Sequence, residues 1–347
     1  MKIADYLNPD HCPAEKPEIE AMAASTRLLH EAIDRAMRQS GIPYLHPEDP
    51  TIQLDLLGSA RMIAWQEAKA SLLFEGGGCW SELPQVYARY GVETTRRLLK
   101  KVLELEHATC AVLTDCGMQA CALLFDVLLK PAAHAVLMRQ VYNKTRKYLE
   151  WLSGRVGGTV SIVDDGDYPA VEKALRKNTA LIFAETYTNP LLRAVDPVRL
   201  GGLVARARAS TAPEVHLIVD STIASPWAFA KPLLEYEGVD FVVASGTKCL
   251  SGQDRDLWGY IASRDAQAMN TLMDLQAMRG GSLDWRRASA LLDGLPVAKE
   301  RFERRSKSSS HVAQFLHSHP LVSEVYHPSL PGQIGRASCR ERVYVLV

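Results

Sequence analysis

Short, mainly apolar runs alternate with amphipathic helical patterns through the middle of the chain. These runs occupy residues 110–114, 134–138, 160–163, 180–184, 216–220 and 241–244. Strands of this kind, with apolar side chains on both faces, are typical of a parallel sheet that helices cover on both sides. The pattern therefore predicts an α/β fold, with a large domain over residues 86–265 built on a mostly parallel sheet.

Helical patterns flank this domain on both sides. In residues 21–37 apolar positions recur every three or four residues, which indicates that residues 1–85 form an N-terminal helical arm. After Asp265 the helical pattern returns, and residues 321–326 form a run that could open a strand. We therefore expect residues 266–333 to begin a smaller C-terminal domain.

The charges of the chain balance. Lys and Arg together number 40, as do Asp and Glu, so the formal net charge is zero. Bulk electrostatics then give no reason to expect a nucleic acid or an anionic membrane as a partner. A small molecule is the expected ligand.

The cysteines and the N-terminus indicate the compartment. The seven cysteines are scattered, with neither a CxxC pair nor a His/Cys cluster at zinc spacing. They favour a reducing environment and no bound metal. The N-terminal residues lack the pattern of a signal peptide, and no apolar run approaches the roughly 20 residues that span a bilayer. We therefore expect a cytoplasmic protein with no membrane partner.

Polar residues directly follow several of the apolar runs, at residues 115–119, 185–190, 220–222 and 245–248. Parallel α/β sheets bind ligands at the carboxyl ends of their strands, so these residues are candidates for a site. Simpler interpretations also exist. Asp220 could cap a helix, Gly117 could punctuate a turn, and the segment that ends in Lys248 could be a surface turn.

Taken together and in this order, these segments are similar to the motifs of a known family. They read TDCGMQA, ETYTNPLL, VDSTIASP and SGTKCLSGQ, where the family has SSGMAA, ETPSNPTL, VDNTFATP and SATKYLGGH. The stretch that contains Tyr87 and Arg89 resembles the family's YxRxxNPT. By this resemblance, from about residue 80 to about residue 333, the chain is identified as a member of the Cys/Met metabolism (transsulfuration) family of pyridoxal-phosphate-dependent enzymes. The resemblance implies fold type I, with a mostly parallel, seven-stranded type of sheet flanked by helices.

The resemblance also implies roles for residues around the cofactor ring. Lys248 would hold pyridoxal 5'-phosphate as a Schiff base and, once the substrate amine releases it, move protons as a general base and acid. Asp220 would keep the pyridine nitrogen protonated, and Asn189 would hydrogen-bond the phenolic oxygen. Tyr142 would stack on the ring and help to activate the substrate; the alternative is a core residue at a helix start.

The doubly anionic phosphate requires its own donors. By the resemblance, Gly117 and Met118 would supply backbone amides at the start of a helix expected from about Gln119. The other residues expected to bind the cofactor are Ser245 and Thr247, through their hydroxyl groups, and Glu185 and Thr222.

Tyr87 and Arg89 imply an assembly of subunits. In the family these residues reach the phosphate of the cofactor that the neighbouring subunit holds. The resemblance therefore implies a homodimer at least, and usually a homotetramer.

Departures from the family pattern leave the reaction open. The Gly-Gly-His that follows the family's lysine is Ser251, Gly252 and Gln253 here. The resemblance implies β- or γ-elimination, or γ-replacement, on cystathionine-, methionine- or O-acylhomoserine-like substrates. The alternatives are another fold-type-I enzyme, such as an aminotransferase or a decarboxylase, and a non-catalytic family member.

The last residues of the chain differ in character from the segments before them. Residues 334–343 resemble the in-frame translation of a common sequencing adapter. We therefore expect the family match to stop near Gln333, residues 334–347 to be an artefactual tail, and the C-terminal domain to be partial. The family's arginine that clamps the substrate carboxylate would then lie outside this chain, so we expect weak activity or poor solubility.

Overall fold

The structure, a computed structural model, describes Arg89 and residues 91–330. The chain divides into two compact units, Met1–Thr94 and Thr95–Val347, and nearly all the described residues belong to the second. The predicted helical arm at residues 1–85 and the tail from residue 334 lie outside the described residues.

A seven-stranded sheet forms the centre of the described fold, in the order β1-β7-β6-β5-β4-β2-β3. Its strands are β1 (Cys110–Thr114), β2 (His134–Met138), β3 (Thr159–Val163), β4 (Thr179–Glu185), β5 (His216–Asp220), β6 (Val239–Ala244) and β7 (Gly259–Ser263). Neighbouring strands are parallel except at β7, which runs antiparallel to β1 and β6. The expected α/β fold with a mostly parallel sheet is confirmed, and each predicted apolar run lies in a strand.

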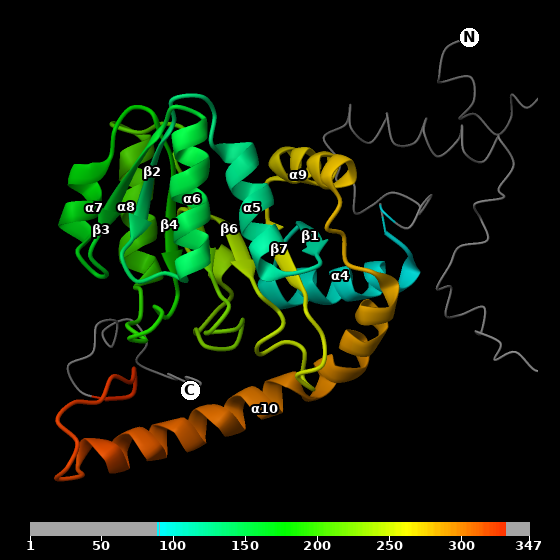
Figure 1. Cartoon of the computed structure of the whole chain (residues 1–347), viewed down its shortest axis with the longest axis vertical. Helices are drawn as coiled ribbons and strands as arrows, with labels where there is room; N and C mark the ends of the chain where they lie inside the picture. The colour runs from blue at the N-terminus through cyan, green and yellow to red at the C-terminus, as the bar shows by residue number, and fades with distance from the viewer. Residues whose placement is uncertain (1–88, 90, 331–347) are drawn as a thin grey trace, which may run out of the picture. The chain divides into compact units, whose positions relative to one another are not determined.

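Helices flank the sheet (Figure 1). They are α4 (Glu93–Glu106), α5 (Gly117–Leu128), α6 (Asn143–Arg155), α7 (Tyr168–Ala174), α8 (Pro197–Arg208), α9 (Ala266–Arg279) and α10 (Trp285–His317), with a 3₁₀ turn at Leu233–Glu235. The chain crosses the sheet from β1 through β2 to β3, and then turns back through β4, β5 and β6. Because such crossovers are right-handed, α5 and α6 lie on one face and α7 and α8 on the other.

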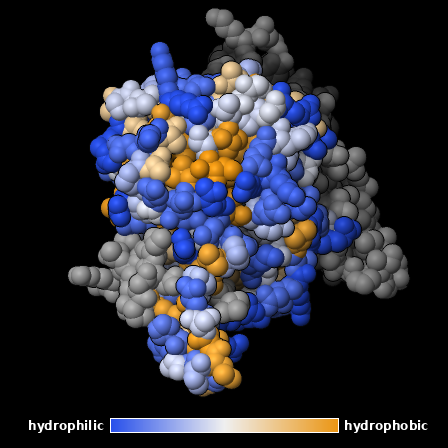
Figure 2. All heavy atoms as spheres, turned by 60° about the vertical axis from the view of Figure 1, so that its left-hand side comes forward, coloured by the Kyte–Doolittle hydropathy of each residue, from blue (hydrophilic) through white to orange (hydrophobic). Residues whose placement is uncertain are grey.

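The β3 edge of the sheet is less deeply buried than the β1 edge. All side chains of β1, β2 and β7 are buried, whereas β3 is partly exposed. Figure 2 turns the β3 side forward and shows mainly hydrophilic residues around an apolar patch. In the part of the chain that the structure describes, no helix is both long enough and apolar enough to cross a membrane.

Aspartates start the later helices. Asp196 accepts hydrogen bonds from the amides of Val198 and Arg199 at 3.0 and 3.1 Å, ahead of α8. Asp265 accepts one from the amide of Ala268 at 3.0 Å, ahead of α9. These carboxylates satisfy amides that the first helical turn leaves without partners, and they favour the positive end of the helix dipole.

The segment after α10 differs from its predicted structure. The pattern of residues 321–326 is one that could open a strand, but these residues form none, and Leu321 is 89% exposed. A strand is stabilised by hydrogen bonds to a neighbouring strand, and no strand among the described residues is paired with this segment. The apolar run alone was therefore insufficient evidence.

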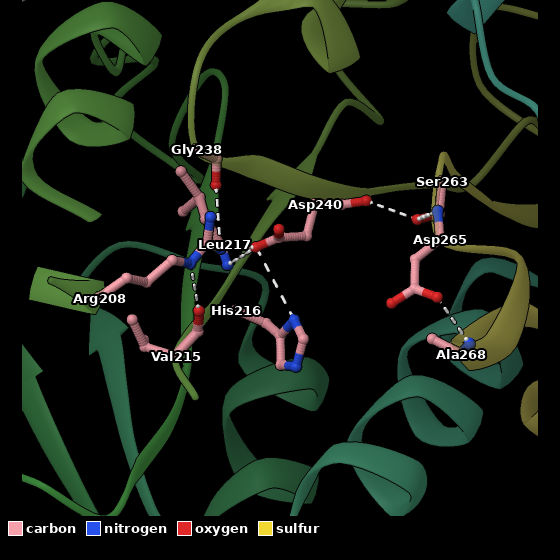
Figure 3. A network of polar contacts seen from close by, with 9 residues as sticks. All are labelled: Arg208, Val215, His216, Leu217, Gly238, Asp240, Ser263, Asp265 and Ala268. Atoms are coloured by element: carbon pink, nitrogen blue, oxygen red, sulfur yellow. Dashed lines mark hydrogen bonds and ion pairs between the residues drawn. The ribbon is translucent and has the colours of Figure 1, made fainter. Parts of the chain in front are cut away.

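A polar network holds the amino ends of β5 and β6 together, at the end of the sheet opposite the candidate site (Figure 3). Asp240 of β6 pairs with Arg208 at the end of α8 and accepts a hydrogen bond from the amide of Leu217 at 2.7 Å. Its backbone carbonyl accepts one from the Ser263 hydroxyl at 2.8 Å. Asp240 thus connects one helix and three strands.

A buried acid, Glu106, lies at the end of α4. The side chain is fully buried, and its Oε1 lies 2.5 Å from the Tyr260 hydroxyl, while Oε2 has no hydrogen-bond partner among the described residues. Burial raises the pKa of Glu106 from 4.5 to about 7, although the Tyr260 hydrogen bond and His107 act in the opposite direction. The folded protein therefore holds this proton at a pH where the unfolded chain has lost it.

This pKa predicts a pH dependence of stability. The contribution of protonated Glu106 is fully present below about pH 4.5 and is lost as the pH rises through about 7. From pH 5 to pH 8 the free energy of unfolding of the wild type should fall by about 2 to 3 kcal/mol relative to that of Glu106→Gln, because only the wild type has this proton to lose. Denaturant titrations at both pH values measure this difference.

The matched control is Glu104→Gln on the same helix, since Glu104 is exposed beside Lys101. This control should keep a constant offset from the wild type across the pH range. If Glu106→Gln also keeps a constant offset, the buried acid does not titrate as described.

Candidate functional site

The sheet has a topological switch point between β2 and β4. The two strands are neighbours, yet α6 follows β2 on one face and α8 follows β4 on the other. Loops diverge at such a point, and α/β sheets bind ligands there, outside the carboxyl ends of the strands. Tyr142 lies in the loop after β2, and Glu185 ends β4.

Two acids lie at the carboxyl ends of adjacent strands. Glu185 and Asp220 are direct neighbours in the parallel register of β4 and β5. Both side chains are buried, at 5% and 7% exposure. The segments that the sequence analysis singled out after these two strands therefore meet.

Asp220 is a buried carboxylate, and within residues 91–330 no cation is paired with it. Its Oδ1 accepts a hydrogen bond from the amide of Thr222 at 2.8 Å, and the Thr222 hydroxyl is a second donor. Burial raises the pKa of Asp220 to about 6 despite these hydrogen bonds. No helix follows, so the alternative role of Asp220 as a helix cap is wrong. A cationic group placed here would stabilise the ionised form.

Glu185 holds the loops around it. Its Oε1 accepts a hydrogen bond from the backbone amide of Tyr142 at 2.6 Å. The backbone amide of Asn189 also acts on this carboxylate and lowers its pKa. Burial, and then the charge of Asp220, raise the pKa of Glu185 well above its usual range. The loops after β2 and β4 are thereby tied to one side chain.

The start of α5 lies directly against the loop after β6. A Cβ atom on Gly117 would lie 2.6 Å from the Cβ of Ser245, so only glycine permits this approach. The helix begins at Gly117, two residues before the predicted start, and the Cys116 thiol accepts the Gln119 amide at 3.4 Å. The absence of a side chain at Gly117 thus brings the N-terminus of α5 against the loop after β6, and helix N-termini are where phosphates bind.

Threonine hydroxyls organise the loop between β6 and Lys248. The Thr222 hydroxyl accepts a hydrogen bond from the amide of Ser245 at 2.9 Å, which connects this loop to the end of β5. The Thr247 hydroxyl donates to the Trp258 carbonyl at 3.1 Å and accepts from the Trp258 amide at 3.0 Å. The Thr247 hydroxyl proton is thus engaged in the hydrogen bond to Trp258. To donate to a phosphate, Thr247 would have to give up that bond, so this role stays a prediction.

Lys248 lies at a turn after β6. Its amide donates to the Ser245 carbonyl at 3.3 Å, and its side chain is exposed. The next residue, Cys249, is buried in an apolar cluster that includes Phe302 of α10. The chain around the lysine is thus anchored on one side while the amine remains accessible.

The loop beyond the lysine is fixed to α10. The carbonyl of Gly252 accepts a hydrogen bond from Arg301, and Asp254 pairs with both Arg301 and Arg305. A Cβ atom on Gly252 would collide with the backbone of Gly294, so helix and loop touch through their backbones. The segment that departs from the family motif therefore has a specific packing role here.

The remaining predicted residues lie around this edge. Tyr142 precedes α6, and its ring is 47% exposed, so the alternative interpretation as a core residue is wrong. Met118 accepts a hydrogen bond at its sulfur from Thr145 of α6 at 3.6 Å. Asn189 is exposed and precedes a cis proline.

The pair expected to reach a neighbouring subunit lies at the limit of the structure. Tyr87 lies outside the described residues, and Arg89 is exposed. Their predicted role needs a second subunit and stays a prediction.

Sequence reasoning missed Arg287. Its Nη1 donates to the carbonyls of Asp115 at 3.0 Å and Leu257 at 2.9 Å, and its Nε pairs with Asp284 at 2.6 Å. These contacts join α10 to the turn before α5 and to the approach to β7. No local signal could have found them, because Asp115 lies 172 residues away along the chain.

Pyridoxal phosphate, which the resemblance implies, fits the residues present. A protonated ring nitrogen needs a buried carboxylate without a competing cation, and Asp220 meets that need. A phosphate binds at a helix N-terminus, and α5 begins at Gly117, directly against Ser245. Lys248 supplies an accessible amine, on the same loop as Ser245, which lies against Gly117 and is hydrogen-bonded to Thr222.

Comparisons with known proteins agree with this fit. A family model described as Cys/Met metabolism PLP-dependent enzyme matches residues 75–342. L-methionine gamma-lyase of Fusobacterium nucleatum subsp. nucleatum is 33% identical over 250 residues, 72% of this chain and 61% of that protein. Cystathionine gamma-synthase of Escherichia coli strain K12 is 32% identical over 252 residues, 72% of this chain and 62% of that protein.

A solved structure shares the fold. The crystal structure of metB from Corynebacterium glutamicum matches with a TM-score of 0.69 and 29% identity, over 75% of this chain and 65% of that one. The chain spans less than two thirds of the length of each of these relatives. With the family model matching most of the sequence and the fold shared, the chain belongs to the pyridoxal-phosphate-dependent enzymes of Cys/Met metabolism.

Proposed function

We propose that the protein catalyses β- or γ-elimination, or γ-replacement, on a sulfur-containing or O-acylated amino acid. The observation that carries the proposal is the set of contacts around Ser245, which lies against Gly117, is hydrogen-bonded to Thr222 beside Asp220, and shares a loop with Lys248. Asp220, Gly117 and Lys248 supply the carboxylate, the helix N-terminus and the amine that pyridoxal phosphate requires.

The chain's own residues divide the work. When bound, pyridoxal phosphate supplies an electron sink for the charge that develops at the substrate Cα. Asp220 would hold a proton on the ring nitrogen, and the amine of Lys248, exposed in the structure, would take and return the Cα proton. The Tyr142 ring is accessible to stack on the cofactor. The names of the relatives, a γ-lyase and a γ-synthase, support both elimination and replacement as outcomes.

A neighbouring subunit completes the proposed site. Tyr142 and Lys248 are exposed in the single chain, which supports a homodimer or homotetramer in which a partner covers them. Arg89 and Tyr87 are the residues proposed to reach that neighbour. The free cysteines among the described residues support a cytoplasmic, reducing location.

The reaction can be tested by product analysis. Purified protein with pyridoxal phosphate is incubated with L-methionine, cystathionine or O-acylhomoserine, with and without a thiol, and the 2-oxo acid, ammonia and thioether are measured. We expect release of a 2-oxo acid with ammonia, or formation of a thioether. Lys248→Ala should lower the rate by at least about a hundredfold, because it removes the proton-transferring amine.

Lys307→Ala is the matched control, since Lys307 is an exposed lysine on α10, and its rate should equal that of the wild type. Product that forms only with added keto acid would indicate an aminotransferase, and carbon dioxide release a decarboxylase. Either result, or no turnover of bound cofactor and substrate, contradicts the proposal.

The approach of α5 to Ser245 predicts a specific loss of cofactor affinity. In Gly117→Ala the added Cβ would press on Ser245 and separate the two sides of the proposed phosphate site. We expect the dissociation constant for pyridoxal phosphate, measured by absorbance titration, to rise at least about tenfold, or about 1.4 kcal/mol.

Gly154→Ala on α6 is the control, because a Cβ there meets nothing within 4 Å. It should bind the cofactor like the wild type and be as stable or up to about 1 kcal/mol more stable. Equal affinities for the two variants would refute the placement of the phosphate.

A further inference from the structure

Glu185 has a position that differs from that of a simple cofactor ligand. Its side chain is buried at the end of β4, beside Asp220. The backbone amide of Tyr142 donates to it at 2.6 Å, and the backbone amide of Asn189, on the loop after the same strand, lowers its pKa. By the family resemblance, Glu185 is expected to bind the cofactor. In the structure, its contacts are with the backbone of Tyr142 and Asn189, two other residues expected to bind the cofactor.

The two amides come from opposite sides of the switch point. Tyr142 precedes α6, on the loop after β2, whereas Asn189 lies on the loop after β4. These loops diverge onto different faces of the sheet, so the strands alone do not fix their mutual position. A second tie supports the same junction, since the Thr188 hydroxyl donates to the Gln140 side chain at 3.2 Å.

The buried environment of the Glu185 carboxylate makes its contact with the backbone amides important for stability. Asp220 and Asp165 are the acidic groups that act on Glu185, and both disfavour its charge, while the two amides favour it. If the carboxyl group is removed, the amide of Tyr142 loses its acceptor, which costs free energy where water is excluded. The loops after β2 and β4 then lose the side chain that both contact.

We propose that Glu185 is a positioning residue, which fixes the backbone of Tyr142 and Asn189 so that their side chains reach the cofactor from two sides. This inference rests on the proposed function and deepens it. Glu185 itself need not touch the cofactor. Its effect on cofactor affinity therefore passes through the Tyr142 and Asn189 side chains.

A double-mutant comparison tests this route. The dissociation constant for pyridoxal phosphate is measured for Glu185→Ala and Glu185→Gln in the wild-type background. The same two changes are measured in a background that carries Tyr142→Ala and Asn189→Ala. Thermal unfolding without cofactor is recorded for every variant, so that a general loss of folding is detected separately.

In the wild-type background we expect Glu185→Ala to raise the dissociation constant at least about tenfold. Glu185→Gln, which keeps one acceptor oxygen, should recover part of that loss. In the Tyr142→Ala, Asn189→Ala background, Glu185→Ala should change the constant by less than about twofold, because the side chains that it positions are gone.

Full additivity, with the same fold-change in both backgrounds, would overturn the inference, since Glu185 would then act directly or through general stability. A wild-type affinity unchanged by Glu185→Ala would overturn it as well. Glu172→Ala, at an exposed acid on α7, serves as the control and should change nothing. If the wild type binds no pyridoxal phosphate, the proposed function fails first, and that result is distinct from additivity.

Discussion

The candidate site depends on the burial of two neighbouring acids, Glu185 and Asp220, at the ends of adjacent parallel strands. Like charges so close and so far from water cost free energy unless donors or cations compensate them. The structure compensates Glu185 with the amides of two loops and leaves Asp220 with the donors of Thr222 only, among the described residues. One acid is thereby structural, and the other is available for a cationic ligand.

Close backbone approaches complete the same edge. Gly117 lets α5 reach Ser245, and Gly252 and Gly294 let the lysine loop reach α10. Arg301 and Arg287 then add hydrogen bonds from α10 to backbone carbonyls. Since exposed ion pairs contribute little by themselves, the backbone contacts are the stronger reason why the loop around Lys248 keeps its position.

Much of the fold was predictable because its signals are local. A buried parallel strand needs only a short run of apolar residues, and such a run is visible in the sequence. The runs that form β1 to β6 were therefore identified correctly. The antiparallel β7 was not singled out, because a short strand of that kind has no distinctive period. The run at residues 321–326 carried a strand-like pattern without a partner, and the structure shows that pairing decides the outcome.

The candidate site was predictable only in part. The polar residues after the strands were found because parallel topology brings strand ends together. Contacts between residues far apart in the sequence cannot be seen in a local pattern. The Glu185 carboxylate accepts a hydrogen bond from the amide of Tyr142, 43 residues earlier, and Arg287 donates one to the carbonyl of Asp115. Such pairings become visible only once the sheet order is known.

The most direct test of the central claim is to locate the cofactor on the chain. Protein incubated with pyridoxal phosphate is reduced with borohydride, digested and mapped by mass spectrometry. The account predicts one stoichiometric pyridoxyl group on the peptide that contains Lys248, and its absence in Asp220→Ala at the same cofactor concentration. A label on another lysine, or no label on Lys248, would contradict it.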